Sequence, residues 1–340
     1  MRPERQELYN RLASTIGKTP LTELHSIEIP NNNKILAKEE YRNPTGSHYD
    51  RIILALLQGL ERQGEFSEGD LLTDTTTGNS GASFAWLCRA LKFRCEVIIP
   101  QDMPAARIAQ IKSYGASVEY SESGRYVEGL LAHLESRFEH ATCKINLPDH
   151  AGNTDFPPAA MRALGEELAE DLHEKGYSRA DYFICALGNG ASTYVGEPLK
   201  AKLKTKTVGF EPIESPTLFL RKYSKEIFRE RYGVEAELRS HELIGTGPGE
   251  VDFPFPLFDD TLTDFDDIQL VTQREWEPMM EELADLEGQH VGRTSAASVC
   301  AALELAKHVS ESTILVLFYD QAWKYLDLHD SDALAGAADA

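Results

Sequence analysis

Residues 71–100 read LLTDTTTGNSGASFAWLCRALKFRCEVIIP, and this stretch decides the fold class. Two short β-rich runs, 71–75 and 95–100, have the length of strands and flank a longer run, 80–92, that suits a buried helix. A strand, a helix and a second strand in this order predict a βαβ unit with parallel strands. The polar loop TTTGNS then follows the carboxyl end of a strand, where α/β proteins bind ligands.

The same alternation continues along the chain in two series separated by a turn-rich stretch, 147–158. The further elements that we expect are helices over 104–114, 124–138, 159–175, 193–204, 275–287 and 294–308, and strands over 117–120, 143–146, 181–186, 206–210 and 313–318. Strands that alternate with helices predict an α/β protein with parallel or mixed sheets flanked by helices.

Composition and charge argue against several classes of function. A chain of 340 residues suggests two domains or one large α/β unit, and 42% hydrophobic residues are enough to bury substantial cores. Its net charge of −21 argues against nucleic-acid binding. We also expect no membrane partner, because no apolar run approaches the roughly 18 residues that cross a bilayer and the first residues do not form a secretory signal. The five cysteines form no CxxC pair and no metal-ligand spacing, which is typical of a cytoplasmic protein without a structural metal.

The hydroxyl-rich loop 75–81 (TTTGNSG) joins the strand 71–75 to the following helix. Hydroxyl groups and unpaired backbone N–H groups at a helix N-terminus form an anion site, suited to a carboxylate. The same residues would also serve as an ordinary helix cap, and the pattern alone does not choose between the two.

A second candidate site is the turn at 188–192 (GNGAS), between the strand 181–186 and a helix. Small residues let backbone amides converge on a phosphate, and the helix dipole favours the negative charge. The plainer interpretation is a tight turn between a strand and a helix.

Residues 43–51 (NPTGSHYDR) resemble a signature of the cysteine synthase-like enzymes that use pyridoxal phosphate. The segments 17–21 (GKTPL), 208–212 (VGFEP) and 288–297 resemble further motifs of that family, in the same order. In the family a lysine stands where this chain has Tyr49, and it carries the cofactor as a Schiff base. A phenol cannot form an imine with an aldehyde, so the resemblance implies a cofactor enzyme without its covalent tether.

The resemblance covers about residues 15 to 326 and implies the two-domain fold-type II architecture of the tryptophan synthase β-like proteins. We expect a smaller mobile domain at 40–150 that carries the substrate loop. A larger domain, 1–39 and 151–330, would carry the phosphate cup, and 331–340 would form a flexible acidic tail. Such proteins are usually homodimers that act as lyases or transferases in amino-acid metabolism.

The resemblance also assigns roles to residues of the two loops. The substrate-binding residues would be Thr76, Thr77, Gly78 and Ser80, which would hold an amino-acid carboxylate. Asn79 would contact the ring hydroxyl of the cofactor. The phosphate would lie in the cup formed by Gly188, Asn189, Gly190, Ala191 and Ser192, where Asn189 and Ala191 depart from the family. Gln321 aligns with the family serine that faces the pyridine nitrogen.

Tyr49 could inherit only the lysine's second role, that of a catalytic acid or base, and only if its pKa of about 10 is lowered. We expect little help from His48, because neighbouring side chains of an extended segment point to opposite faces. Lys38 is a possible substitute for the missing lysine, but family members carry a lysine at this strand position beside the catalytic one.

Three accounts of Tyr49 stay open. The chain is an enzyme of altered chemistry that holds the cofactor non-covalently or takes a preformed amino-acid aldimine. Alternatively, it is a pseudoenzyme that senses a small molecule or binds a partner. A deliberately introduced substitution is the third account, and the further departures at His48, Ala191 and Gln321 favour natural divergence over it.

Overall fold

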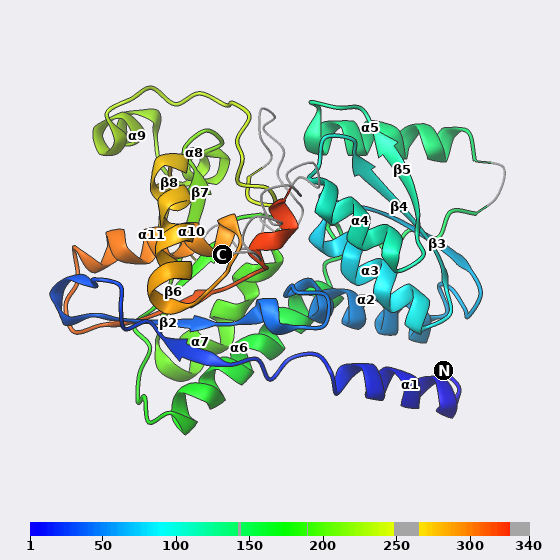
Figure 1. Cartoon of the computed structure of the whole chain (residues 1–340), viewed down its shortest axis with the longest axis horizontal. Helices are drawn as coiled ribbons and strands as arrows, with labels where there is room; N and C mark the ends of the chain where they lie inside the picture. The colour runs from blue at the N-terminus through cyan, green and yellow to red at the C-terminus, as the bar shows by residue number, and fades with distance from the viewer. Residues whose placement is uncertain (142–143, 189, 248–264, 327–340) are drawn as a thin grey trace, which may run out of the picture.

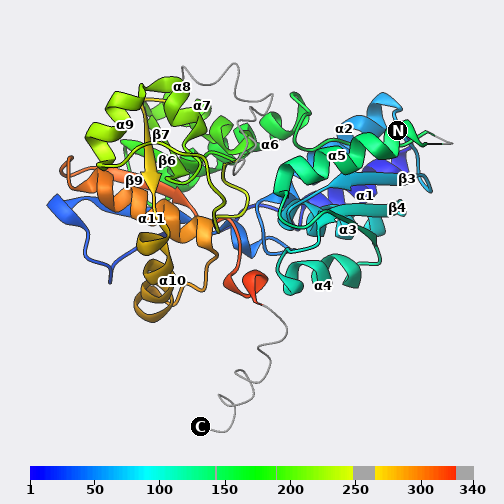
Figure 2. The ribbon, with the colours of Figure 1, turned by 90° about the horizontal axis from the view of Figure 1, so that it is seen from above.

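The computed structural model of the chain describes residues 1–141, 144–188, 190–247 and 265–326. They form two α/β units, each built on its own sheet, which lie side by side in Figures 1 and 2. The expected α/β class with parallel and mixed sheets is confirmed. Within these residues no helix is both long and apolar enough to cross a bilayer.

The larger sheet has the strand order β1-β2-β9-β6-β7-β8. Its strands are β1 (Leu21–Glu23), β2 (Lys34–Lys38), β6 (Tyr182–Ala186), β7 (Lys206–Pro212), β8 (Asp267–Val271) and β9 (Thr313–Leu317). The edge strand β1 runs antiparallel to β2, and the other pairs are parallel. Parallel neighbours bring the carboxyl ends of β6 and β9 to the same edge.

The smaller sheet contains β3 (Leu71–Thr75), β4 (Arg94–Pro100) and β5 (Ser117–Ser121), all parallel. Its helices are α2 (Tyr49–Gln63), α3 (Asn79–Ala90), α4 (Ala105–Ser113) and α5 (Tyr126–Glu139). Asn146 makes a single parallel bridge with Leu72, so the expected strand at 143–146 is reduced to one pairing, and Cys143 lies outside the described residues.

The helices of the larger unit are α6 (Phe156–Glu174), α7 (Gly196–Leu203), α8 (Thr217–Lys222), α9 (Lys225–Tyr232), α10 (Gln273–Glu287) and α11 (Arg293–Ala306). Two short 3-10 helices also matter for the site, η3 (Ala191–Val195) and η5 (Ala322–Tyr325). The sequence predicts α6, α7, α10 and α11 but not α8 and α9, because these lie in a polar stretch without a clear apolar period.

Each sheet has its own hydrophobic core. The N-terminal helix α1 (Pro3–Ala13) packs on the smaller core, where Tyr9 is fully buried and donates a hydrogen bond to Glu61 at 2.7 Å. The expectation that residues 1–39 belong to the larger unit therefore differs from the packing of this helix. The division into domains and the mobility of the smaller one stay predictions.

The two units are joined where the chain crosses between them. Helix α2 follows β2 and lies against α6, where Gly59 leaves room for the ring of Phe156. At the other end, η5 reaches α4, and the amide of Ala106 donates to the carbonyl of Leu326 at 3.3 Å. These crossings position side chains of both units around one pocket.

Candidate functional site

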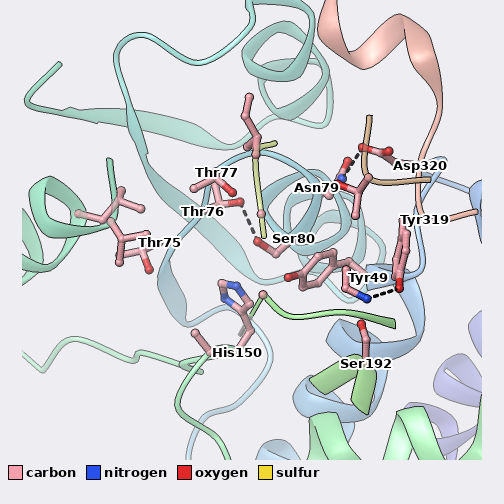
Figure 3. Close-up of a pocket in the computed structure, with 18 of the residues that line it drawn as sticks. Tyr49, Thr75, Thr76, Thr77, Asn79, Ser80, His150, Ser192, Tyr319 and Asp320 are labelled. Atoms are coloured by element: carbon pink, nitrogen blue, oxygen red, sulfur yellow. Dashed lines mark hydrogen bonds between the residues drawn. The ribbon is translucent and has the colours of Figure 1, made fainter. Parts of the chain in front are cut away.

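A pocket lies between the two sheets, at the carboxyl ends of β3, β6 and β9 (Figure 3). The smaller unit lines it with Tyr49, Thr75, Thr76, Thr77, Asn79, Ser80 and Arg107. The larger unit lines it with Ala186, Gly188, Ser192, Gly245, Gly247, Thr294, Tyr319 and Asp320. The rest of the wall is formed by four apolar residues of α5 and by His48, Leu147, Asp149, His150, Ala151 and Ile244. The structure thus brings Tyr49 and parts of both predicted loops together.

The hydroxyl loop is shaped by its own hydrogen bonds. Thr76 Oγ1 accepts from the amides of Gly78 and Gly81, both at 2.9 Å, and lies 2.7 Å from Ser80 Oγ. Gly78 has φ 140° and ψ −67°, which favours glycine, and a side chain at Gly81 would come within 2.5 Å of Thr76 Cγ2. Thr76 therefore caps α3, and Thr75, Thr77 and Ser80 are the other residues of this loop that bring a hydroxyl group to the pocket.

Both ends of the Asn79 amide are bound within the protein. Its Nδ2 donates to Asp320 Oδ2 at 2.7 Å, and its Oδ1 accepts from Lys324 Nζ at 2.9 Å. Lys324 is fully buried, and this burial lowers its pKa to about 8. Asn79 therefore lines the pocket with an amide that already has partners on the opposite wall.

One carboxylate oxygen of Asp320, Oδ2, accepts several hydrogen bonds. Its Oδ2 also accepts from Tyr325 at 2.9 Å and from Arg107 Nη2 at 3.3 Å, whereas its buried Oδ1 has no partner among the described residues. Any side chain at Gly292 would collide with this oxygen. Arg107 also donates to the carbonyl of Thr77 at 2.9 Å and lies over the ring of Tyr325, 4.3 Å from its centroid. An ion pair thus connects α4 to the chain after β9.

The predicted phosphate cup is present in part. Gly188 and Ser192 line the pocket, and a side chain at Gly188 would collide with the carbonyl oxygen of Gly245. Gly190 has φ 97° and begins η3, which sets the turn but does not place the residue at the pocket. Ala191 is fully buried in the larger core, and Asn189 lies outside the described residues. Gly245 and Gly247 supply the facing rim, which the sequence analysis missed.

Tyr49 begins α2, and its ring meets two histidines. The centroid of His48 lies 4.4 Å away at an interplanar angle of 46°, and that of His150 lies 5.8 Å away, edge to face. His48 has helical φ and ψ of −60° and −19°, so the expectation that it points away from Tyr49 is wrong. Burial lowers the pKa of His48 to about 4, so its ring is neutral at neutral pH.

His150 pairs with Asp74, the residue before the hydroxyl loop. Its Nδ1 lies 3.2 Å from Asp74 Oδ2, and its backbone amide donates to the same oxygen at 3.4 Å. Burial opposes charge on the ring, but the attraction of Asp74 outweighs it and raises the pKa of His150. The sequence analysis missed this pair, because the residues lie 76 positions apart and His150 sits in a turn without a motif.

Gln321 and Lys38, which the sequence offered as a cofactor-binding residue and a substitute lysine, both lie outside the pocket. Gln321 faces away from the pocket: its Oε1 accepts a hydrogen bond from the indole of Trp323 and lies close to Gly46. Thr294 of α11 supplies a hydroxyl group to the pocket instead. The ammonium of Lys38 donates to the carbonyl of Thr19 at 2.6 Å and to two carboxylates. Among the lining residues that the structure describes, none is a lysine.

Comparisons with known proteins agree on one family. A family model described as pyridoxal-phosphate dependent enzyme matches residues 12–320. Cysteine synthase B of Escherichia coli (strain K12) is 27% identical over 321 residues, 93% of this chain and 94% of that protein. The probable cysteine synthase of Bacillus subtilis (strain 168) is 28% identical over 316 residues, 92% of this chain and 95% of that protein.

Solved structures show the same architecture. A hydrogen sulfide-producing enzyme from Fusobacterium nucleatum is 27% identical with a TM-score of 0.79, over 93% of this chain and 99% of that chain. O-ureido-L-serine synthase, at 23% identity and a TM-score of 0.78, covers 95% of both chains and bears on the fold alone.

Proposed function

Because the chain belongs to the family of pyridoxal-phosphate dependent enzymes, we propose that it binds an amino-acid-like ligand in the pocket between its two sheets and holds pyridoxal phosphate there without a covalent bond. The observation that carries the proposal is the pocket wall: Tyr49 and parts of the two predicted loops line it, and no described lining residue is a lysine. Relatives named cysteine synthase favour β-replacement or β-elimination of an amino acid as the reaction class, with altered chemistry at Tyr49.

The glycine-rich rim supports a phosphate group. Gly188 approaches the backbone of Gly245 more closely than any side chain allows, and Gly247 and Ser192 line the same part of the pocket. Backbone that is bare of side chains, with a hydroxyl beside it, is the chemistry that binds phosphate in many turns. These four residues would hold the phosphate, and Asn79 and Thr294 would face the ring.

The opposite part of the pocket supports an amino-acid carboxylate. Thr77 and Ser80 present hydroxyl groups at the N-terminus of α3, whose dipole favours negative charge. Arg107 is buried beside them and bonded to the carbonyl of Thr77. Thr76 contributes indirectly, because its hydroxyl holds the loop in shape.

Pyridoxal phosphate, when bound, supplies an electron-withdrawing ring that stabilises negative charge beside the amino group of a ligand. The protein's own residues bind, orient and move the proton. We assign the proton transfer to the phenol oxygen of Tyr49, which extends into the pocket between Ser80 and His150 (Figure 3). The apolar side chains Val127, Leu130, Leu131 and Leu134, which share one face of α5, would keep water from the bound ligand.

A second candidate function is a sensor that binds an amino acid without chemistry. The amide of Asn79, which the resemblance assigns to the ring hydroxyl of the cofactor, is already bound by Asp320 and Lys324. A pocket that has given up the cofactor would keep the carboxylate loop and use the remaining space for the ligand alone.

The first experiment titrates the purified protein with pyridoxal phosphate and records absorption and melting temperature before and after borohydride. The proposal predicts a saturable absorption band and a raised melting temperature, with no cofactor fixed to the chain by reduction. A fixed adduct would contradict non-covalent binding, and peptide mapping would identify the lysine. No band, together with stabilisation by amino acids alone, would favour the sensor.

Matched variants test the carboxylate site. Ser80→Ala and Thr77→Ala should each reduce the stabilisation that an amino acid gives, because each removes one donor to the ligand. Ser136→Ala, which removes an exposed hydroxyl on α5 outside the pocket, should leave it unchanged. Full stabilisation in both pocket variants would show that the ligand binds elsewhere.

The homodimer and the cytoplasmic location are further proposals, supported by the resemblance and by the cysteine pattern. Light scattering after size exclusion would test the dimer through the molar mass, because one chain has a mass of 37.9 kDa.

A further inference from the structure

One pair of titratable residues, His150 on the pocket wall and its partner Asp74, has no part in the roles assigned so far. Asp74 is the penultimate residue of β3 and is 4% exposed, and His150 is 8% exposed on the facing segment. Asp74 Oδ1 accepts from the amide of Thr75 at 2.8 Å, and Oδ2 accepts from the amide of His150 and lies 3.2 Å from its Nδ1. The ring of His150 is therefore fixed in place by a buried carboxylate.

His150, the outer member of this pair, lies directly beside Tyr49. The rings of Tyr49 and His150 meet edge to face, and Figure 3 shows the phenol oxygen extending toward the imidazole. Because Nδ1 faces Asp74, the other ring nitrogen, Nε2, is the one on the side of the pocket. A carboxylate that orients an imidazole, and an imidazole beside a hydroxyl, is an arrangement that moves protons.

We propose that Asp74 and His150 form a proton relay for Tyr49, in which His150 accepts the phenolic proton and Asp74 is a positioning residue. The inference rests on the proposed function, in which Tyr49 exchanges a proton with the ligand. It replaces the base that a lysine would supply at position 49.

The step balances within the three side chains. The O–H bond of Tyr49 breaks and leaves its electron pair on the phenolate oxygen, while an N–H bond forms at His150 Nε2. The resulting imidazolium donates its Nδ1 hydrogen to Asp74, whose negative charge offsets the new positive charge. The phenolate can then accept a proton from a ligand, and the proton on Nε2 is available for return.

The surrounding charges favour this direction of transfer. Asp74 and the adjacent Asp149 both attract a proton to His150 and raise its pKa. His48, on the other side of Tyr49, is neutral and does not compete. The remaining charged groups that line the described pocket, Arg107 and Asp320, pair with each other at 3.3 Å.

The test measures the titration of the Tyr49 phenol by NMR in protein labelled at the tyrosine ring carbons, with the signal assigned from Tyr49→Phe. We expect His150→Gln to raise the pKa of the Tyr49 phenol by about one unit or more, because the variant cannot form the imidazolium that accepts the phenolic proton and stabilises the phenolate. His133→Gln is the matched control, since His133 also pairs with a glutamate but lies outside the pocket. It should leave the Tyr49 titration unchanged.

A second readout separates positioning from simple packing. Asp74→Asn should lower the pKa of the His150 ring, and Asp74→Glu should restore it. An unchanged Tyr49 titration in folded His150→Gln would overturn the relay, as would an unchanged His150 titration in Asp74→Asn. If the Asp74 variants do not fold, the Tyr49 titration in His150→Gln tests the relay by itself.

These measurements need neither cofactor nor ligand. The relay can therefore fail while amino acids still stabilise the protein, which would leave the proposed function standing. Conversely, loss of ligand binding in the Ser80 and Thr77 variants does not affect the titration.

Discussion

Thr76→Val tests whether one side chain holds the hydroxyl loop in shape. Valine has nearly the shape of threonine and replaces the hydroxyl by a methyl group. Thr76 is 3% exposed, and its Oγ1 is the acceptor for the amides of Gly78 and Gly81. The substitution therefore leaves two buried N–H groups without their acceptor, and removes the hydrogen bond with Ser80.

The expected cost follows from these contacts. An unsatisfied buried donor costs about 1–3 kcal/mol, and loss of a helix cap about 0.5–2 kcal/mol. Because the amides at the loop can recruit water in part, we expect a total loss of about 2–4 kcal/mol of unfolding free energy. Thr76→Ser keeps the oxygen and loses only the methyl group that contacts Gly81, so it should cost about 1 kcal/mol.

The assay is urea unfolding followed by circular dichroism, with hydrogen exchange of the Gly81 amide as the local measure. We expect faster exchange at Gly81 in Thr76→Val and near-normal exchange in Thr76→Ser. The serine variant should also keep the stabilisation that an amino acid gives, whereas the valine variant should lose it. Equal unfolding free energies for the valine variant and the wild type would refute the reasoning, as would equal losses in both variants.

Three further predictions concern the fold. Burial raises the pKa of Glu211 to about 7, above its ordinary 4.5, so its contribution to stability is present below pH 4.5 and is lost as the pH rises through 7. Glu211→Gln should remove about 3 kcal/mol of the change in unfolding free energy between acidic and slightly alkaline pH, which urea unfolding measures. An unchanged pH dependence would contradict the assignment. Arg107→Ala should lower the unfolding free energy by about 3–5 kcal/mol, because it leaves the buried Asp320 without its ion-pair partner. In a double-mutant cycle with Asp320→Asn, we expect a coupling energy of at least about 1 kcal/mol, and strictly additive losses would rule out the coupling. Tyr9→Phe should cost about 1 kcal/mol through the lost bond to Glu61 and speed proteolysis near α1, which equal cleavage rates would disprove.

Local patterns were sufficient for the order of most elements, but not for α2, α8 and α9, which no expected helix covers. The runs 71–75 and 95–100 and the helix between them are read from the chain itself, because apolar period and turn residues act over short distances. The same holds for the hydroxyl loop and the Gly188 turn, whose glycines are needed by backbone geometry and close approach. The position of both loops at strand ends follows from the α/β alternation.

The position of Gln321 outside the pocket has a simple geometric origin. Side chains of neighbouring residues in an extended segment point to opposite sides, so a displacement of one position exchanges pocket and exterior. Asp320 faces the pocket and Gln321 faces Trp323. A motif assigns a side chain to the pocket only where its spacing is unambiguous, and the spacing of the segment 319–325 is ambiguous by one residue.

The amino-acid sequence by itself determined the fold class and the two loops, whereas the position of Tyr49 at the start of α2 was not predicted. Only the tertiary structure decided which side chains surround that phenol. Asp74 and His150 meet across 76 positions, and Asn79 and Asp320 across 241, through the packing of two sheets that no local pattern encodes. Burial among these partners then sets the protonation of His48, His150 and Lys324, because the free energy of a charge depends on the groups around it.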